Sequence, residues 1–225
     1  MIEDLRWLGI HWDEGPDCGG PFAPYSQSER RKLHLKAWRQ LRDSGAIYPC
    51  NCSRKDLAQA ASAPNDADDE LIYPGRCRSQ TDASQFSEPR GVNWRFRVPD
   101  GEIIEFADLH LGDQRFVAGL DFGDFIVWRR DNVPAYQLAV TVDDVEMQIS
   151  EVVRGADLLK STARQLLLYR ALGWTPPAFY HCDLVADEAG ARLAKRHDAL
   201  SIRRLRALGW TREQVINRAV PAAKP

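Results

Sequence analysis

The sequence of 225 residues has no long apolar run, no leader pattern and no excess of one charge. A helix that crosses a bilayer needs about 20 consecutive apolar residues, and no segment approaches that length. Met1–Arg6 lacks the basic and apolar regions of a signal peptide, so we expect a cytoplasmic protein without membrane contact. The formal net charge of −2 does not indicate a nucleic-acid-binding protein, although a local basic patch can bind phosphate.

The sequence also lacks the even set of cysteines that a disulfide framework requires. Five cysteines are present: Cys50 and Cys52 are one residue apart, Cys77 follows, and Cys18 and Cys182 stand alone. Zinc favours four tetrahedral ligands and binds thiolates well, so three cysteines would leave one position for another donor. No histidine lies between residues 35 and 109, which leaves a water, a carboxylate or a tyrosine oxygen. The alternative is a set of buried free thiols that pack as small apolar side chains.

A third absence concerns the front of the chain, where we find no opening strand with a phosphate-binding turn. Apolar spacing predicts the end of a helix in 1–12 and, after a cap at Ser26 or Ser28, a helix over 26–44. The remaining predicted helices are 53–60, 161–172, 201–208 and 211–219, with a loop over 61–70. The predicted strands are 46–52, 92–98, 125–130, 136–142, 151–155 and 178–184. The second half therefore predicts an α/β half-domain with a parallel sheet, and the β-rich middle predicts an insertion.

Two further segments carry residues suited to ligand binding. Asp143 and Asp144 follow an apolar segment, and Arg154 lies close behind. Acidic residues after a parallel strand lie at the sheet edge where α/β proteins bind ligands, and an arginine there can pair with a carboxylate. The alternative for the acidic pair is a helix cap and a salt bridge. Arg192–His197 carries three cations in five residues, which suits either a solvated surface loop or a pyrophosphate site.

Seven segments in order carry a resemblance to a known family. They are Leu8–Pro16, Tyr25–Arg30, Tyr48–Cys50, Tyr136–Ala139, Val142–Asp144, Val153–Asp157 and Arg192–His197. Together they resemble the class I glutamyl-tRNA synthetases over nearly the whole chain. The closer resemblance is to a short paralogous family, the glutamyl-Q tRNA(Asp) synthetases. This closer resemblance rests on the cysteine pattern, on the sequence of Val153–Gln165 and on a chain that stops soon after Lys195.

The resemblance implies an activity, substrates and site residues. Enzymes of this kind use ATP and Mg²⁺ to activate glutamate and transfer it to queuosine at the wobble position of tRNA(Asp). Tyr136 and Arg154 would bind glutamate, and Lys195 with Arg192 would bind ATP, with Lys195 as the catalytic residue. A structural Zn²⁺ would be held by a set of four residues that includes a tyrosine. That set is Cys50, Cys52, Tyr73 and Cys77.

Two departures from the family pattern qualify these expectations. Arg192 and Ala194 stand where the ATP-binding loop usually has lysine and serine. The family's HIGH motif would precede Met1, so we expect an N-terminally truncated chain with little or no adenylation activity. The alternatives are an N-terminal fragment of a discriminating glutamyl-tRNA synthetase, and a non-catalytic, zinc-stabilised module that binds tRNA or a partner.

The expected fold class is α/β: a Rossmann-type class I synthetase catalytic domain without its first strand, turn and helix. We expect its first part in residues 1–45, a zinc-bearing insertion in 46–125, the second half with the ATP-binding loop in 126–197 and a helical tail in 198–225. The expected assembly is a monomer.

Overall fold

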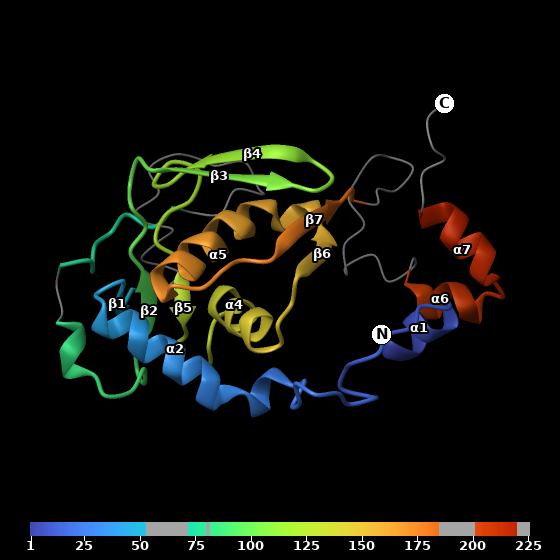
Figure 1. Ribbon diagram of the computed structural model, residues 1–225, viewed down its shortest axis with the longest axis horizontal. Helices are drawn as coiled ribbons and strands as arrows, with labels where there is room; N and C mark the ends of the chain where they lie inside the picture. The colour runs from blue at the N-terminus through green and yellow to red at the C-terminus, as the bar shows by residue number, and fades with distance from the viewer. Residues whose placement is uncertain (53–71, 80–81, 185–200, 220–225) are drawn as a thin grey trace. The chain divides into compact units, whose positions relative to one another are not determined.

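The computed structural model describes residues 1–52, 72–79, 82–184 and 201–219 (Figure 1). The chain divides into two compact units, one formed by residues 24–182 and the other by residues 1–23 with 183–225. The predicted helix 53–60 and loop 61–70 lie outside the described residues. The four expected domains remain a prediction.

The described part of the larger unit contains three α-helices: α2 (Arg31–Asp43), α4 (Tyr136–Glu146) and α5 (Leu159–Leu172). Short 3₁₀ turns precede α2 (Gln27–Glu29) and α5 (Ala156–Leu158), and a third covers Ala83–Gln85. The predicted helix 26–44 therefore begins later than expected, because the hydroxyl groups of Ser26 and Ser28 bond each other instead of capping it. It ends before Gly45, whose φ of 72° is the left-handed conformation that glycine adopts readily.

The segment 136–142 is helical, so its prediction as a strand was wrong. Seven mostly apolar residues cannot by themselves distinguish a buried strand from a buried helix. Here Leu138, Ala139 and Val142 share the face of α4 that is buried in the core. Consequently Asp143 and Asp144 lie on the last turns of α4 and not at the edge of a sheet.

Within the described residues of the larger unit, seven strands form three separate sheets. The strands are β1 (Ile47–Cys50), β2 (Asn93–Phe96), β3 (Ile103–Asp108), β4 (Gly112–Val117), β5 (Ile126–Trp128), β6 (Glu151–Gly155) and β7 (Ala178–Cys182). β1, β2 and β5 form an antiparallel sheet in that order, and β3 and β4 form a hairpin. β6 and β7 pair in parallel, as the alternation of strands and helices predicted.

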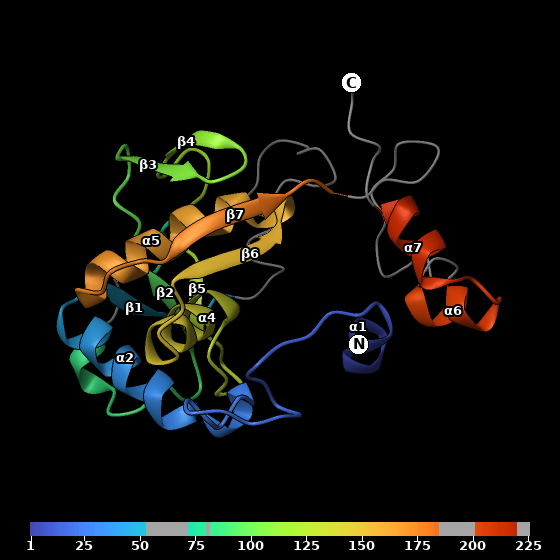
Figure 2. The same cartoon turned by 45° about the vertical axis from the view of Figure 1, so that its right-hand side comes forward.

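Both views show the hairpin β3–β4 lying along α5, with β7 beside the same helix (Figures 1 and 2). The core between the helices and the antiparallel sheet contains Trp38 of α2, Trp94 of β2 and Trp128 of β5, all fully buried. The rings of Trp38 and Trp94 meet edge to face with centroids 4.8 Å apart, a favoured aromatic geometry. This core fixes the positions of β1, which ends at Cys50, and of the neighbouring strand β2, which carries Arg95.

In the smaller unit the described residues form α1 (Ile2–Trp7), α6 (Ile202–Ala207) and α7 (Arg212–Ala219). Arg206 of α6 donates hydrogen bonds to Asp4 at 2.8 Å and to Glu3 at 3.0 Å, which joins the two ends of the described chain. The predicted helices of the tail are confirmed, and the Ser201 hydroxyl accepts the backbone N–H of Arg204 as a cap. None of the described helices has the length and apolar character needed to cross a lipid bilayer.

Candidate functional site

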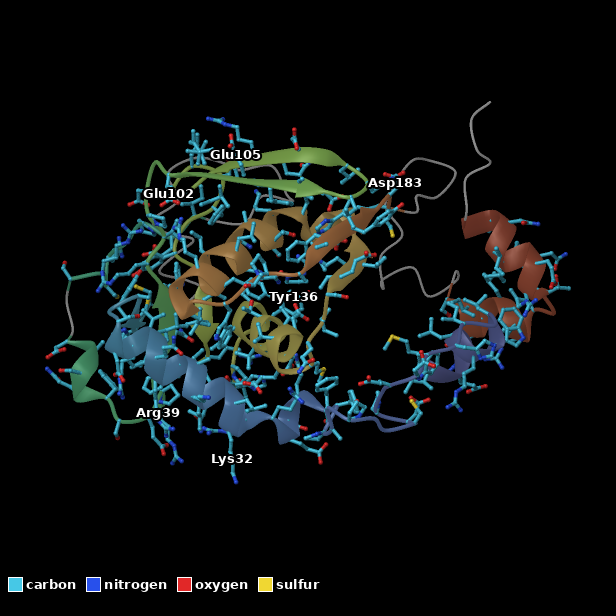
Figure 3. All side chains as sticks on the ribbon, in the orientation of Figure 1. Lys32, Arg39, Glu102, Glu105, Tyr136 and Asp183 are labelled. Carbon is cyan, nitrogen blue, oxygen red and sulfur yellow. The ribbon has the colours of Figure 1, made fainter. Side chains whose placement is uncertain are left out.

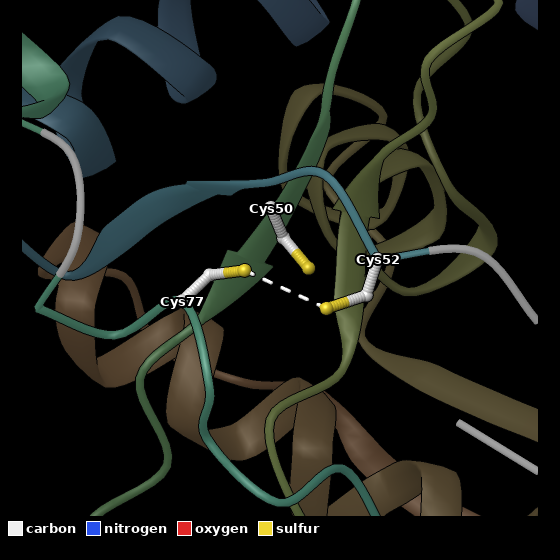
Figure 4. Close-up of side chains that lie close together, drawn as sticks. All are labelled: Cys50, Cys52 and Cys77. Atoms are coloured by element: carbon white, nitrogen blue, oxygen red, sulfur yellow. Dashed lines mark hydrogen bonds between the residues drawn. The ribbon is translucent and has the colours of Figure 1, made fainter. Parts of the chain in front are cut away.

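Three cysteine sulfur atoms converge at the end of β1 (Figure 4). Cys50 is the last residue of β1, Cys52 follows it, and Cys77 approaches from the loop that ends before β2. All three Sγ atoms lie within 4.8 Å of one another, and those of Cys52 and Cys77 are 3.6 Å apart. The Tyr73 hydroxyl oxygen lies 3.4 Å from Cys50 Sγ and 3.6 Å from Cys52 Sγ. The sequence-predicted set Cys50, Cys52, Tyr73 and Cys77 is therefore brought together.

The spacing of these atoms fits a tetrahedral zinc site. With Zn–S bonds of about 2.3 Å and a Zn–O bond of about 2.0 Å, sulfur–sulfur edges are about 3.8 Å and sulfur–oxygen edges about 3.5 Å. The Cys52–Cys77 distance of 3.6 Å and the two sulfur–oxygen distances of 3.4 and 3.6 Å match these edges closely. The donor set is also chemically suitable, because thiolates are preferred zinc ligands.

The protein positions the Tyr73 oxygen as well as the sulfur atoms. The backbone N–H of Cys77 donates to this oxygen at 2.9 Å, and the ring is buried. Burial, followed by the hydrogen bonds with the three cysteines, raises the pKa of Tyr73. Burial also opposes ionisation of Cys77, but hydrogen bonds from Tyr73 and from the backbone at Asn51 outweigh it and lower the pKa of that thiol.

A buried arginine supports the cluster from β2. Arg95 Nε donates to Cys50 Sγ at 3.3 Å, and its guanidinium lies 4.0 Å from the centroid of the Tyr73 ring. Arg95 Nη1 donates to the backbone oxygen of Asp124 at 2.7 Å, which fixes the side chain. Arg95 is buried because Cys50 and the Tyr73 ring lie against its side chain.

A second group of polar side chains surrounds Arg154 of β6. Its Nη2 donates to Thr162 Oγ1 at 2.7 Å and to Gln165 Oε1 at 2.8 Å, and its Nε donates to His181 Nε2 at 3.1 Å. Among the described residues, no carboxylate lies within salt-bridge distance of this guanidinium, although Asp144 acts on it electrostatically from farther away. Burial is the largest effect on its pKa and lowers it.

Tyr136 also belongs to this group and lies at the start of α4, between the ribbons of α4 and α5 (Figure 3). Its side chain is 48% exposed, and its hydrogen-bonding and electrostatic influence opposes the lowering of the Arg154 pKa. The next residue, Gln137, accepts from Gln165 at 2.9 Å and donates to Ser161 at 3.0 Å. The two predicted glutamate-binding residues, Tyr136 and Arg154, are therefore neighbours, beside a network of neutral amides and hydroxyls.

The sequence analysis did not predict several of the residues that contact Arg154. Thr162, Gln165 and His181 are buried and each contacts Arg154, whereas the sequence prediction placed the first two only as helix residues and the last only in a strand. A signal was available for His181, because this imidazole directly follows the apolar and aromatic run Ala178–Tyr180. Its burial could not be read from that signal.

The acidic pair divides into two roles. Asp143 accepts from Arg30 Nε at 2.7 Å and from Gln27 at 2.9 Å, with His34 Nε2 at 3.1 Å, so the salt-bridge alternative is confirmed for this residue. Asp144 accepts from the Tyr169 hydroxyl at 3.1 Å. Burial raises the pKa of Asp144 from 3.8 to about 6, against the opposing influence of Tyr169 and Arg154. Arg192 and Lys195 lie outside the described residues, so their ATP-binding roles remain predictions.

Comparison with known families identifies the architecture. A family described as the catalytic domain of class I tRNA synthetases (E and Q) matches residues 1–220. The chain belongs to this family. The expected fold class, a class I synthetase catalytic domain of mixed helices and strands, is thereby confirmed, and so is the prediction of a ligase family.

Individual class I synthetases of this family share much of the sequence. The chain is 50% identical over 219 residues to the glutamyl-Q tRNA(Asp) synthetase of Symbiobacterium thermophilum, covering 96% of this chain and 67% of that protein. It is 48% identical over 212 residues to the protein of the same name from Nitratidesulfovibrio vulgaris, covering 93% and 65% respectively. A glutamate–tRNA ligase 2 of Syntrophus aciditrophicus is 40% identical, with 45% of its length covered. The chain thus spans about two thirds of the first two synthetases and less than half of the third.

A solved class I synthetase has the same fold. The crystal structure of a glutamate tRNA ligase from Elizabethkingia meningosepticum, in complex with its amino acid, matches with a TM-score of 0.71 at 31% identity. The match covers 87% of this chain and 41% of that chain.

Proposed function

We propose that this chain forms a catalytic domain that activates glutamate with ATP and Mg²⁺ and transfers it to queuosine in tRNA(Asp). The observation that carries the proposal is the half-buried Arg154 guanidinium, whose hydrogen-bonded neighbours are all neutral. A partly desolvated charge without a hydrogen-bonded counter-charge is unfavourable, and a ligand carboxylate would supply that counter-charge. Glutamate fits because an arginine fork recognises carboxylates geometrically as well as electrostatically.

The similarity to proteins named glutamyl-Q tRNA(Asp) synthetase supports the choice of tRNA(Asp) as the acceptor. In this proposal Tyr136 lines the glutamate pocket beside Arg154, and Lys195 with Arg192 binds the phosphates of ATP. A structural Zn²⁺ held by the cysteine cluster and Tyr73 supplies no chemistry to the reaction; it fixes the loop before β2 against β1. The expected domain division places that cluster in an insertion over residues 46–125.

The proposal is tested in two steps, binding and then activation. Isothermal titration of L-glutamate measures the first step, and the variant Arg154→Met should bind at least about 100-fold more weakly, because a hydrogen-bonded charge pair is lost. Arg170→Met is the matched control, since Arg170 is 58% exposed and pairs only with Glu102 on the surface. Equal affinities for L-glutamate in the unmodified chain and in Arg154→Met would show that Arg154 does not bind glutamate.

Glutamate-dependent exchange of pyrophosphate into ATP, with and without tRNA, measures the second step. Exchange in the absence of tRNA favours the glutamyl-Q type, because the family resemblance implies that ordinary glutamyl-tRNA synthetases need tRNA for activation. Transfer of labelled glutamate to queuosine-containing tRNA(Asp), and not to queuosine-free tRNA(Asp), then identifies the acceptor. Binding of glutamate without any exchange would favour a tRNA- or partner-binding module over a ligase.

A further inference from the structure

A buried aspartate–histidine pair contacts Arg154 through its histidine. Asp108, the last residue of β3, and His181 of β7 both have side chains with no exposed surface, and Asp108 Oδ2 lies 2.6 Å from His181 Nδ1. The other carboxylate oxygen, Oδ1, accepts backbone N–H groups of His110 at 3.1 Å, Leu111 at 2.9 Å and His181 at 3.3 Å. The pair therefore joins the turn of the β3–β4 hairpin to the strand beside Arg154.

The hydrogen bonds determine which nitrogen of His181 carries the proton. Arg154 Nε is only a donor, so His181 Nε2, 3.1 Å away, must be the acceptor. Thr162 Oγ1, which accepts from Arg154 Nη2, lies 3.1 Å from the same nitrogen. The ring proton is then on Nδ1, where it is donated to Asp108. A proton on Nε2 would face the Arg154 Nε hydrogen.

The consequence is a guanidinium with fixed orientation. Nε is held by His181, and both hydrogens of Nη2 are accepted by Thr162 and Gln165. Nη1 is the remaining nitrogen and is held by none of these three residues. An arginine held in this way loses less side-chain freedom when a carboxylate binds than a mobile one would.

We infer that Asp108 and His181 are positioning residues for Arg154: Asp108 holds His181 in the Nδ1-protonated tautomer, and His181 in that tautomer orients the guanidinium for a ligand carboxylate. The inference rests on the proposed function where it concerns glutamate. The tautomer and the Arg154 contact are properties of the ligand-free chain and stand or fall independently. Neither residue touches the ligand.

An isosteric substitution separates this role from simple packing. In Asp108→Asn the amide oxygen is retained by the three backbone N–H groups that Oδ1 accepts, which places the NH₂ group against His181 Nδ1. Two donors would then face each other unless the ring proton moves to Nε2. On Nε2 that proton faces the Arg154 Nε hydrogen. The variant therefore keeps the shape of the side chain at position 108 but places the His181 proton on the nitrogen that contacts Arg154.

The first measurement is the ¹⁵N spectrum of the histidine rings in the ligand-free chain, with His181 assigned by its loss in His181→Asn. We expect a protonated Nδ1 and an unprotonated Nε2, and the reverse in Asp108→Asn. Asp113→Asn, an exposed position on the same hairpin, is the matched control and should leave the His181 spectrum unchanged. A protonated Nε2 in the unmodified chain would overturn the inference without any reference to glutamate.

The second measurement is the Kd for L-glutamate. Asp108→Asn and His181→Leu should each weaken binding about 10- to 100-fold, as expected for misplacing a hydrogen bond to a charged group. His181→Asn should stay within a few-fold of the unmodified chain, because an amide can accept from Arg154 and donate to Asp108. Equal weakening by His181→Asn and His181→Leu would indicate a packing role and overturn the inference. If the unmodified chain binds no glutamate, the proposed function fails while the tautomer measurement still decides the Asp108–His181–Arg154 arrangement.

Discussion

The cysteine cluster and the side chains around Arg154 suit ligands of opposite charge. At the cluster, the Tyr73 oxygen lies 3.4 Å from Cys50 Sγ and 3.6 Å from Cys52 Sγ, and Cys52 Sγ lies 3.6 Å from Cys77 Sγ, an arrangement that a bound dication would stabilise. Around Arg154, a half-buried guanidinium donates to neutral acceptors, and an anion would supply a hydrogen-bonded counter-charge. The donor atoms of each region therefore indicate the class of its ligand.

The two regions also differ in how they are assembled. The cluster comes from one stretch of chain, residues 50–77, with Arg95 added from the adjacent strand. The side chains around Arg154 come from α4, β6, α5 and β7, and Asp108 of β3 bonds one of them, His181. Substitutions in the cysteine cluster should therefore affect mainly metal binding. Substitutions around Arg154 should alter ligand binding with little effect on the metal.

The largest expected effect is the loss of metal on removing one thiolate. Purified without chelator, the chain should contain about one zinc, and Cys77→Ser should abolish stoichiometric binding, because structural sites need their full tetrahedral set. Elemental analysis measures the zinc content. Cys182→Ser is the matched control, since Cys182 is exposed and outside the cluster. A chain that holds no zinc when supplied with it would exclude the metal site and leave the alternative of buried free thiols.

A smaller effect should follow from removing the cation beside the cluster. Arg95→Met deletes the donor to Cys50 and the charge over Tyr73, so zinc affinity should fall about 10- to 100-fold, the usual range for residues that support metal ligands. Competition with a chromophoric chelator measures the affinity. Arg97→Met is the control, because Arg97 is exposed and stacks on Tyr48 instead. Equal affinities in the two variants would show that Arg95 contributes packing alone. Glutamate binding should be unchanged in both, which tests the separateness of the two regions.

The smallest expected effect concerns Asp144, whose pKa is raised by burial to about 6. Between about pH 4 and pH 6 the unfolded chain ionises this group first, so its contribution to stability falls as pH rises and then stays low. Asp144→Asn avoids this loss and keeps an acceptor for Tyr169. The variant should be more stable by about 1–2 kcal/mol at pH 7.5, after allowing for partial solvent exposure, and nearly equal near pH 4.

Urea unfolding at the two pH values measures the difference, with Asp113→Asn as an exposed control. A variant less stable than the unmodified chain at pH 7.5 would mean that the Asp144 charge is favourable, through its attraction to Arg154. Asp144 would then already balance the charge of Arg154, and the difference in preferred ligand charge between this region and the cysteine cluster would be smaller.

Local patterns account for the successful sequence predictions. The strand leading into Cys50, the parallel pair β6–β7 and the tail helices follow from alternation, apolar spacing and caps within a few residues of each element. The cysteine spacing and the short-range return of Cys77 were sufficient to predict a three-thiol set. The tyrosine ligand came from the family resemblance, since spacing alone left water or a carboxylate open.

The sequence by itself therefore determined the fold family, most element types and the candidate residues Cys50, Cys77, Tyr136 and Arg154. The tertiary structure decided that residues 136–142 form a helix, because burial against α2 and α5 overrides an apolar run that suits either state. It also decided that Arg95 is buried and that Asp108 reaches His181, 73 positions away. Such contacts depend on how separate elements pack, and that information is absent from the spacing within any one of them.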